Sequence, residues 1–159
     1  MGKAILVCGK LCCGKTTYAE SISREENAVL LSVDEIMLAV FGQHSGDKHD
    51  EYVLKIKKYL LEKSAELLSK NINIILDWGF WTRSERDNVR DYFHSRNVDT
   101  ELHLIELNSK EWKHRINERN QAVLEDDGDA YFIDKSVLEK FEKIFEQPED
   151  DEIDIYVRN

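Results

Sequence analysis

A short segment near the amino end has the residue types and the spacing of a phosphate-binding loop. The nine residues concerned are Gly9, Lys10, Leu11, Cys12, Cys13, Gly14, Lys15, Thr16 and Thr17. Two glycines with four residues between them, then a lysine and a threonine, fit the pattern Gly-x-x-x-x-Gly-Lys-Ser/Thr, in which backbone N–H groups surround phosphate oxygens. We expect this segment to bind ATP, with Lys15 on the β- and γ-phosphates and the Thr16 hydroxyl on Mg²⁺.

The elements expected around this segment suit that chemistry. The apolar run at residues 4–8 predicts a buried parallel strand, and residues 15–24 predict a helix. Glycines let the backbone curl toward a phosphate, and a helix N-terminus adds partial positive charge. The order of strand, glycine loop and helix therefore favours a true site over a chance match in a turn.

The three cysteines, Cys8, Cys12 and Cys13, all lie in or beside this loop, and no further cysteine or histidine stands nearby at zinc spacing. One interpretation makes them small residues that fill space. A second interpretation is redox control, because a helix N-terminus lowers the pKa of a thiol and oxidation in the loop would block nucleotide entry.

Two carboxylates follow predicted strands that end at the same edge of a sheet as the loop. Asp34 comes after the strand at residues 28–31, and Asp77 ends the strand at residues 72–76. We assign Asp34 as the general base toward a hydroxyl acceptor and Asp77 as the metal-supporting acid, although the reverse assignment stays open. The plain alternatives are a helix cap for Asp34 and a turn residue for Asp77.

Four arginines and one tryptophan complete the candidate site. Arg115 and Arg119 are one helical turn apart, and we expect them on a lid at residues 115–133 that closes over the transferring phosphate; its residues 125–130 are expected to be mobile. Arg83, Arg86 and Trp78 follow the third strand and are expected to contact the acceptor. The alternatives are solvated charge for the arginines and core packing for Trp78.

The pattern of apolar runs predicts an α/β fold: a three-layer P-loop NTPase arrangement whose five-stranded, mostly parallel sheet has helices on both faces. We expect residues 1–159 to form one domain of this kind. Further strands are predicted at residues 102–107 and 153–157, and further helices at residues 35–41, 51–70, 82–96, 109–119 and 134–145.

Composition bears on the partners. The chain has 32 acidic and 22 basic residues, and its net charge of -10 disfavours a polynucleotide and favours a small-molecule acceptor. No apolar run has the length of a membrane span, and no targeting segment precedes the first strand, so we expect a cytoplasmic protein without a membrane partner. The oligomeric state stays open.

With these residues placed, the chain resembles the small P-loop kinase-like ATP-binding proteins of an AAA-type family, which is related to zeta toxins, chloramphenicol phosphotransferase and polynucleotide 5′-hydroxyl kinases. The resemblance rests on the phosphate loop and on the blocks at residues 32–35, 77–87, 102–107, 115–120 and 145–148. It implies a nucleoside-kinase-like fold that binds ATP and Mg²⁺, an acceptor hydroxyl activated by Asp34, and lid arginines around the phosphate. Met37 stands where the polynucleotide kinases place an arginine.

We therefore expect a phosphotransferase that moves the γ-phosphate of ATP to a hydroxyl of a small molecule. Two further functions stay open. One is a polynucleotide or nucleotide-sugar kinase, and the second is a nucleotide-binding switch that hydrolyses ATP slowly and has no acceptor.

Overall fold

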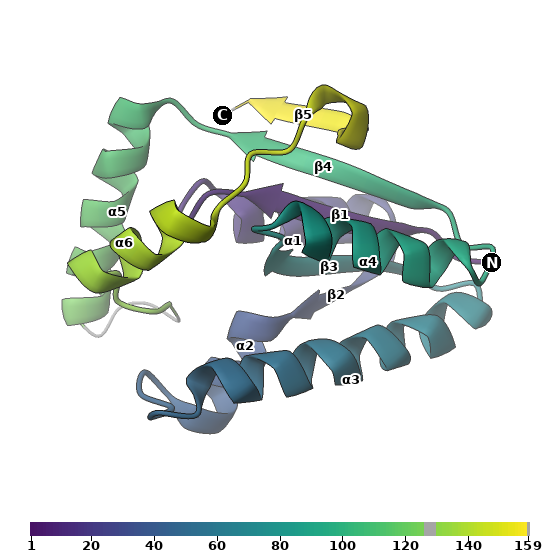
Figure 1. Ribbon diagram of the computed structural model, residues 1–159, viewed down its shortest axis with the longest axis horizontal. Coiled ribbons are helices and arrows are strands. Elements are labelled where there is room, and N and C mark those ends of the chain that lie inside the picture. Colours follow the sequence, from purple (N-terminus) through teal and green to yellow (C-terminus); the bar gives the residue numbers. More distant parts are fainter. Residues whose placement is uncertain (126–129, 159) are drawn as a thin grey trace.

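Strands and helices alternate along the chain, and the five strands of the described residues join one sheet (Figure 1). The computed structural model describes residues 1–125 and 130–158. The strands are β1 (Ala4–Gly9), β2 (Ala28–Ser32), β3 (Asn73–Gly79), β4 (Thr100–Glu106) and β5 (Ile155–Arg158). The helices are α1 (Lys15–Glu25), α2 (Val33–Phe41), α3 (His49–Ser69), α4 (Arg83–His94), α5 (Ser109–Leu124), α6 (Lys135–Ile144) and the 3₁₀ helix η1 (Asp150–Glu152).

The strand order is β2-β3-β1-β4-β5, and each neighbouring pair is parallel. The predicted α/β fold, with the phosphate loop after the central strand, is therefore confirmed. Parallel strands need crossover connections, and the connecting helices cover both faces of the sheet (Figure 1).

The central strand β1 organises the core because all of its residues are buried. Its side chains alternate between two apolar layers: Leu6 packs in the layer beneath α3 and α4, whereas Ile5 and Val7 pack in the layer beneath α1. A large aliphatic side chain that is fully buried contributes about 1.5–3 kcal/mol relative to an exposed one. Burial on both faces thus fixes the strand from which the phosphate loop emerges.

Two packing predictions were wrong. The apolar run at residues 28–31 predicts a buried strand, but β2 is an edge strand and Val29 is 39% exposed. In α3 the helical spacing predicts an inward stripe made of Tyr52, Ile56, Tyr59, Leu60, Lys63 and Leu67. Leu60 is buried and the other members are half-buried, except that Tyr59 is 59% exposed. Tyr59 was misplaced because adjacent apolar residues satisfy the same helical spacing, and Leu60 takes the inward position.

Two boundaries also differ in a way that affects the site. The third strand runs through Gly79, so Asp77 lies within β3 and not after it. The polar, turn-forming residues 42–50 predict a loop, but the loop ends earlier because α3 begins at His49. The expected mobile stretch at residues 125–130 falls mostly outside the described residues.

Helix caps agree well with the sequence. The side chains of Thr82, Asn108 and Asp134 each accept a hydrogen bond from a backbone N–H in the first turn of their helix. The capping-box partner predicted for Thr82 is Glu85, whose carboxylate pairs with Lys57 of α3. Helix α4 is thus capped by Thr82 and tied to α3 by Glu85.

The helices α5 and α6 lie beyond the carboxyl ends of the strands (Figure 1). Their apolar side chains, among them Trp112, Ile116 and Phe141, pack on Leu11 and Cys12 of the phosphate loop. These contacts hold α5 and α6 against the phosphate loop, at the carboxyl ends of the strands. Across the described residues, none of the helices has an apolar stretch suited to crossing a bilayer.

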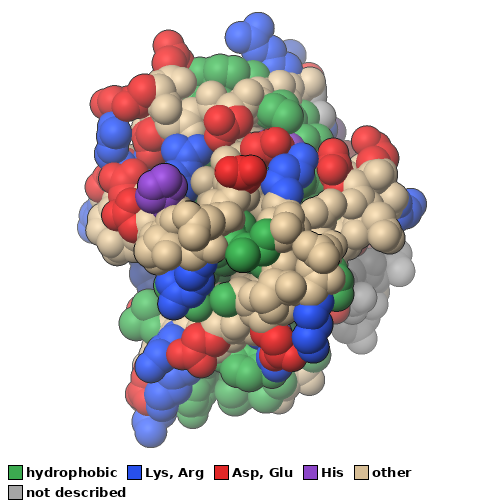
Figure 2. Space-filling model, turned by 90° about the vertical axis from the view of Figure 1, so that its right-hand side faces the viewer, with side chains coloured by type: hydrophobic (Ala, Val, Ile, Leu, Met, Phe, Trp, Pro, Cys, Tyr) green, Lys and Arg blue, Asp and Glu red, His purple; other side chains and the backbone are tan. Residues whose placement is uncertain are grey.

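The amino ends of the strands form the opposite end of the molecule. Figure 2 shows that Lys and Arg side chains lie among Asp and Glu side chains on this face. Interspersed charge of this kind suits solvent exposure more than the binding of a polyanion.

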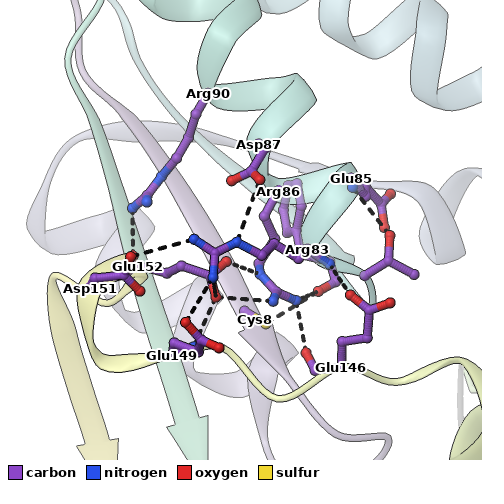
Figure 3. Close-up of polar contacts among 12 residues, drawn as sticks. Cys8, Arg83, Glu85, Arg86, Asp87, Arg90, Glu146, Glu149, Asp151 and Glu152 are labelled. Carbon is purple, nitrogen blue, oxygen red and sulfur yellow. Dashed lines mark hydrogen bonds and ion pairs between the residues drawn. The ribbon is translucent and has the colours of Figure 1, made fainter.

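A buried ion pair joins α4 to the carboxyl-terminal segment (Figure 3). Arg86 is 1% exposed and Glu152 is 3% exposed, and Arg86 Nε donates to Glu152 Oε1 over 2.7 Å. Arg86 Nη1 also donates to the carbonyls of Phe80 and Glu146, at 3.0 and 2.9 Å. Burial pushes the pKa of Glu152 upward, but the hydrogen bonds and charge of Arg86 hold that pKa below its usual value.

We predict that Arg86→Met destabilises the protein by about 3–5 kcal/mol, because it leaves the Glu152 carboxylate buried without its partner. Urea unfolding measures the effect. The double variant Arg86→Met with Glu152→Leu should recover most of the loss. The control Arg83→Met, which removes an exposed guanidinium on the same helix, should unfold near the wild-type midpoint. Equal losses for Arg86→Met and Arg83→Met would contradict the assignment.

Candidate functional site

The segment between β1 and α1 has the backbone of a tight loop. A Cβ atom on Gly9 would lie 2.6 Å from Cys13 Sγ and 2.7 Å from the Ile105 carbonyl oxygen, so only glycine fits there. Gly14 is the N-cap of α1 with φ 96°, and Cys12 has φ 55°. These left-handed conformations fold the loop over the N-terminus of α1, whose free N–H groups favour anions.

Beneath the loop, the expected metal-binding pair is in contact. Thr16 Oγ1 donates to Asp77 Oδ2 over 2.9 Å, which joins the first turn of α1 to β3. The Lys15 ammonium folds back on the loop and donates to the Lys10 carbonyl over 2.5 Å. Sequence positions 61 residues apart are thus brought together at one edge of the sheet.

The Asp77 carboxylate is held in an unfavourable setting. It is 6% exposed, and this burial raises its pKa against the opposing effects of Lys15 and of the Thr16 hydrogen bond. The negative charge of Asp34 raises the pKa of Asp77 further. A bound cation would stabilise the ionised carboxylate of Asp77, which burial disfavours.

The donor set fits Mg²⁺ in the manner of phosphate-loop proteins. The Thr16 hydroxyl and the Asp77 carboxylate are adjacent hard oxygen donors, and Mg²⁺ is usually held by one or two such groups together with waters and phosphate oxygens. Within the described parts of the chain, no cluster of three or more His, Cys, Asp or Glu side chains forms a metal site of its own. The metal role of Thr16 and Asp77 therefore depends on a bound phosphate and stays a prediction.

Asp34 lies at the start of α2 without capping it. The N-cap of that helix is Ser32, whose hydroxyl accepts from the Glu35 N–H at 3.3 Å, so the alternative that made Asp34 the cap is wrong. Asp34 is exposed, and its charge acts on both Asp77 and Tyr131. Asp34 is therefore a solvent-facing carboxylate in the first turn of α2, directly after β2, and its role as base stays a prediction.

Helix α5 brings both predicted lid arginines to the phosphate loop. Arg115 Nη1 lies 3.5 Å from the Cys13 carbonyl oxygen, and Arg119 Nη1 lies 3.3 Å from Cys12 Sγ. Arg119 Nε also donates to the Tyr131 carbonyl over 3.0 Å. Two guanidinium groups thus lie beside the place where phosphates would sit, and the lid at residues 115–133 stays a prediction.

The second pair of arginines lies elsewhere, which corrects the expectation of acceptor contacts. Arg86 is paired with Glu152 in the buried ion pair (Figure 3). Arg83 donates to Glu149 at 2.9 Å and to Asp151 at 3.4 Å. Both side chains point from the first turn of α4 toward the acidic carboxyl-terminal segment, because its carboxylates lie there in the fold.

The cysteines separate by environment. Burial raises the pKa of Cys8 to about 12 and also raises that of Cys13, which opposes thiolate formation at both. Cys12 is half-buried and contacts Arg119. Of the cysteines, only Cys12 therefore keeps the features that redox control would need.

An open cleft of about 420 Å³ adjoins the phosphate loop. Its lining comes from the loop, from β4 and the turn after it, from α5 and from the carboxyl-terminal segment: Gly9, Lys10, Cys13, Leu104, Ile105, Glu106, Leu107, Asn108, Trp112, Gln147 and Arg158. Trp112 forms one wall, with the Lys10 ammonium 5.0 Å from its ring centre. Sequence reasoning missed this cleft, because its residues come from separate segments with no shared motif.

We predict that Asp77→Asn raises the melting temperature at pH 7–8. The folded-state pKa of Asp77 is raised, so the ionised side chain costs stability above that pKa and costs nothing at a pH below the unfolded value of about 4. The gain should therefore shrink as the pH falls toward 4. The exposed control Asp47→Asn should show no such trend. A loss of stability for Asp77→Asn at pH 7 would contradict the prediction.

Comparison with solved structures shows that kinases share this fold. A putative kinase from Chloroflexus aurantiacus superposes with a TM-score of 0.74 at 15% identity, over 99% of this chain and 84% of that one. The Mycobacterium tuberculosis APS kinase, in complex with AMPPNP and APS, gives 0.68 at 13% identity, over 99% and 88%.

A third similar structure has higher identity. A chain of the Pnkp1/Rnl/Hen1 RNA repair complex is 26% identical with a TM-score of 0.67, over 88% of this chain and 42% of that longer one. Comparison of the sequence with curated proteins gave no match.

A family described as an AAA domain matches residues 5–148. This match covers most of the chain, and the structural neighbours share its parallel sheet and flanking helices. The chain therefore belongs to the AAA domain family, with the fold of the P-loop kinases.

Proposed function

We propose that this protein is a phosphotransferase that moves the γ-phosphate of ATP to a hydroxyl group of a small molecule. The observation that carries the proposal is the contact between Thr16 and Asp77 beneath the loop, with the arginines of α5 at the loop and the exposed Asp34 at the same sheet edge. This arrangement supplies a phosphate cradle, a metal-supporting pair and a base within one site.

The nucleotide would lie across the loop, with its phosphates over the N-terminus of α1 and its nucleoside in the adjoining cleft. Support for the nucleotide comes from the APS kinase neighbour, whose structure contains AMPPNP. Leu107 and Trp112 give the cleft an apolar wall, which suits a flat base. Preference between ATP and GTP would depend on polar groups such as Asn108 and Gln147 in the same cleft.

Thr16 and Asp77 would hold Mg²⁺, which, when bound, neutralises charge on the β- and γ-phosphates. Lys15 and the two arginines add positive charge around the same phosphates. An arginine in this position is worth roughly 10³–10⁵ in rate when it meets the charge of the transition state.

The remaining chemistry is a proton transfer and a displacement. Asp34 accepts the proton of the acceptor hydroxyl while the oxygen forms a bond to the γ-phosphorus. The bond between that phosphorus and the β–γ bridging oxygen breaks, and ADP leaves with the electron pair. The products are ADP and the phosphate ester of the acceptor, with the proton held by Asp34 until solvent removes it.

A polynucleotide acceptor is the second candidate, because the RNA repair chain has 26% identity to this one. The net charge of -10 opposes it. A nucleotide-sugar kinase would give a labelled nucleotide sugar from terminally labelled ATP, whereas a switch without an acceptor would release only labelled inorganic phosphate. The labelled product therefore separates these functions from one another.

We predict that Asp34→Asn lowers phosphoryl transfer by about 10²–10⁴-fold, the usual contribution of a general base, and leaves nucleotide binding unchanged. The acceptor is first found by incubating protein, Mg²⁺ and terminally labelled ATP with pooled nucleosides, sugars, other metabolites and oligonucleotides. Calorimetry measures ATP binding. Glu35→Gln, which neutralises the next residue of α2, is the matched control and should keep wild-type turnover.

Full activity in Asp34→Asn would remove Asp34 from the mechanism. ATP binding and slow hydrolysis with no labelled product from any pool would favour the switch and would overturn the phosphotransferase.

The salt dependence of oligonucleotide binding distinguishes a polynucleotide kinase from a kinase of small molecules. We predict that the affinity for a 5′-hydroxyl oligonucleotide is weak and nearly flat between 50 and 200 mM salt, because a chain of this charge releases few counterions from a phosphate backbone. Fluorescence anisotropy measures it. A steep fall in affinity, together with transfer of label to the oligonucleotide, would establish the second candidate instead.

A further inference from the structure

In the part of the chain that the structure describes, two aromatic side chains that pack next to α2 each carry a buried polar atom without a hydrogen-bond partner. Among the described residues, the buried side-chain atoms with no partner are Trp78 Nε1, Tyr131 Oη and Arg90 Nε. Arg90 still donates from its Nη2 to Glu152 and Asp154, so its guanidinium is partly satisfied. The indole and the phenol have no such compensation. Because a buried donor without a partner is costly, each of these two groups needs an explanation.

The two groups share one environment. The rings of Trp78 and Tyr131 both pack on an apolar cluster built from Val33 and Met37 of α2 and Leu60 of α3. Further aromatic rings from α2 and α3, Phe41 and Tyr52, belong to the same cluster and stack on each other. We call the rings and aliphatic groups of this set the aromatic cluster. Trp78 and Tyr131 are half-buried as residues, whereas Trp78 Nε1 and Tyr131 Oη are themselves buried.

The aromatic cluster borders the base. Asp34 lies between Val33 and the rest of α2, and its negative charge adds to the effect of burial in raising the pKa of Tyr131. The same charge acts on Asp77 at the phosphate loop. Because Val33 belongs to the aromatic cluster and Asp34 is the next residue of α2, a molecule lying against the cluster would lie on the same side of the fold as Asp34.

Tyr131 is held in place from both sides of the site. The Gln43 amide donates to the Ala130 carbonyl over 2.7 Å and accepts from the Phe132 N–H at 3.3 Å. Arg119 donates to the Tyr131 carbonyl, and the His49 ring meets the Tyr131 ring edge on. The backbone of Tyr131 is thus fixed between the loop that follows α2 and the arginine at the phosphate loop.

Three basic side chains of α3 and α4 are paired with carboxylates, and Arg119, which donates to the Tyr131 carbonyl, also contacts the phosphate loop. Arg83 and Arg86, expected from the sequence to face an acceptor, are paired with carboxylates of the carboxyl-terminal segment. Lys57 of α3 is paired with Glu85. What this side of the site offers a ligand is therefore apolar rings and hydrogen-bond donors, which suits an uncharged molecule and not a phosphorylated one.

We infer that Trp78 and Tyr131 recognise the acceptor, and that the acceptor is an uncharged hydroxyl compound with an apolar or aromatic ring and at least one carbonyl, ether or ring-nitrogen acceptor. This inference rests on the proposed function. The indole N–H donates to the ligand and the phenol donates or accepts, so that both groups are satisfied when the acceptor is bound. The ring of the acceptor packs on the aromatic cluster, and its hydroxyl faces Asp34.

The experiment compares paired probes with the full chain, Mg²⁺ and terminally labelled ATP. The uncharged set is four nucleosides and a series of 4-nitrophenyl glycosides, and the charged set is the corresponding nucleoside 3′-monophosphates and sugar phosphates. We expect labelled product from the uncharged set, with at least tenfold higher kcat/KM than from the charged partners.

Variants then test the two residues on the best uncharged probe. Tyr131→Phe should raise KM by about 3- to 10-fold, the effect of one lost hydrogen bond, with kcat and ATP affinity unchanged. Trp78→Phe should do the same. Tyr59→Phe, on the exposed face of α3, is the matched control and should behave as wild type. Because Tyr131 Oη has no partner among the described residues, Tyr131→Phe should melt no lower than wild type.

The outcomes are distinguishable. Transfer to the charged set alone, or a wild-type KM in both Tyr131→Phe and Trp78→Phe, overturns this inference and leaves the phosphotransferase in place. ATP binding without transfer to either set overturns the phosphotransferase, and the inference with it. A melting temperature for Tyr131→Phe well below wild type also counts against the inference, since the hydroxyl would then have a structural role.

Discussion

The contact between the Thr16 hydroxyl and the Asp77 carboxylate is the interaction on which the site depends. It joins the helix after the phosphate loop to the strand next to β1, so it sets the position of the loop relative to the sheet. Burial of Asp77 makes its ionised form costly, and the nearby charge of Lys15 offsets only part of that cost. Such strain is typical of a site arranged for a charged ligand.

Around that contact the fold separates the arginines into two groups. Arginines of α5 face the phosphate loop, whereas those at the start of α4 neutralise the acidic carboxyl-terminal segment. In the proposed function, this separation gives positive charge on the phosphate side of the site and apolar aromatic groups on the proposed acceptor side. An enzyme with this division would favour a charged donor molecule and an uncharged acceptor.

Much of the fold follows from local patterns. The buried run of β1, the glycine loop and the capping residues Thr82 and Asn108 depend on nearest neighbours, so the sequence was sufficient to place them. Sequence patterns were less reliable where tertiary packing determines which side chains are buried. Val29 has the apolar character of a core strand but lies on an edge, and Tyr59 was predicted to face inward from α3 but is exposed, because spacing alone does not say which apolar residue meets the sheet.

The sequence by itself determined the phosphate loop, its place after a buried parallel strand, and the carboxylates Asp34 and Asp77 near the carboxyl ends of two strands, because each is a local signal tied to backbone geometry. Only the tertiary structure decided which cations serve the site. Arg115 and Arg86 look alike in the chain, yet one contacts the loop and the other is buried against Glu152. The cleft beside the loop and the shared surroundings of Trp78 and Tyr131 could not be predicted from the sequence either. They are formed by residues far apart in sequence, whose contacts arise from packing.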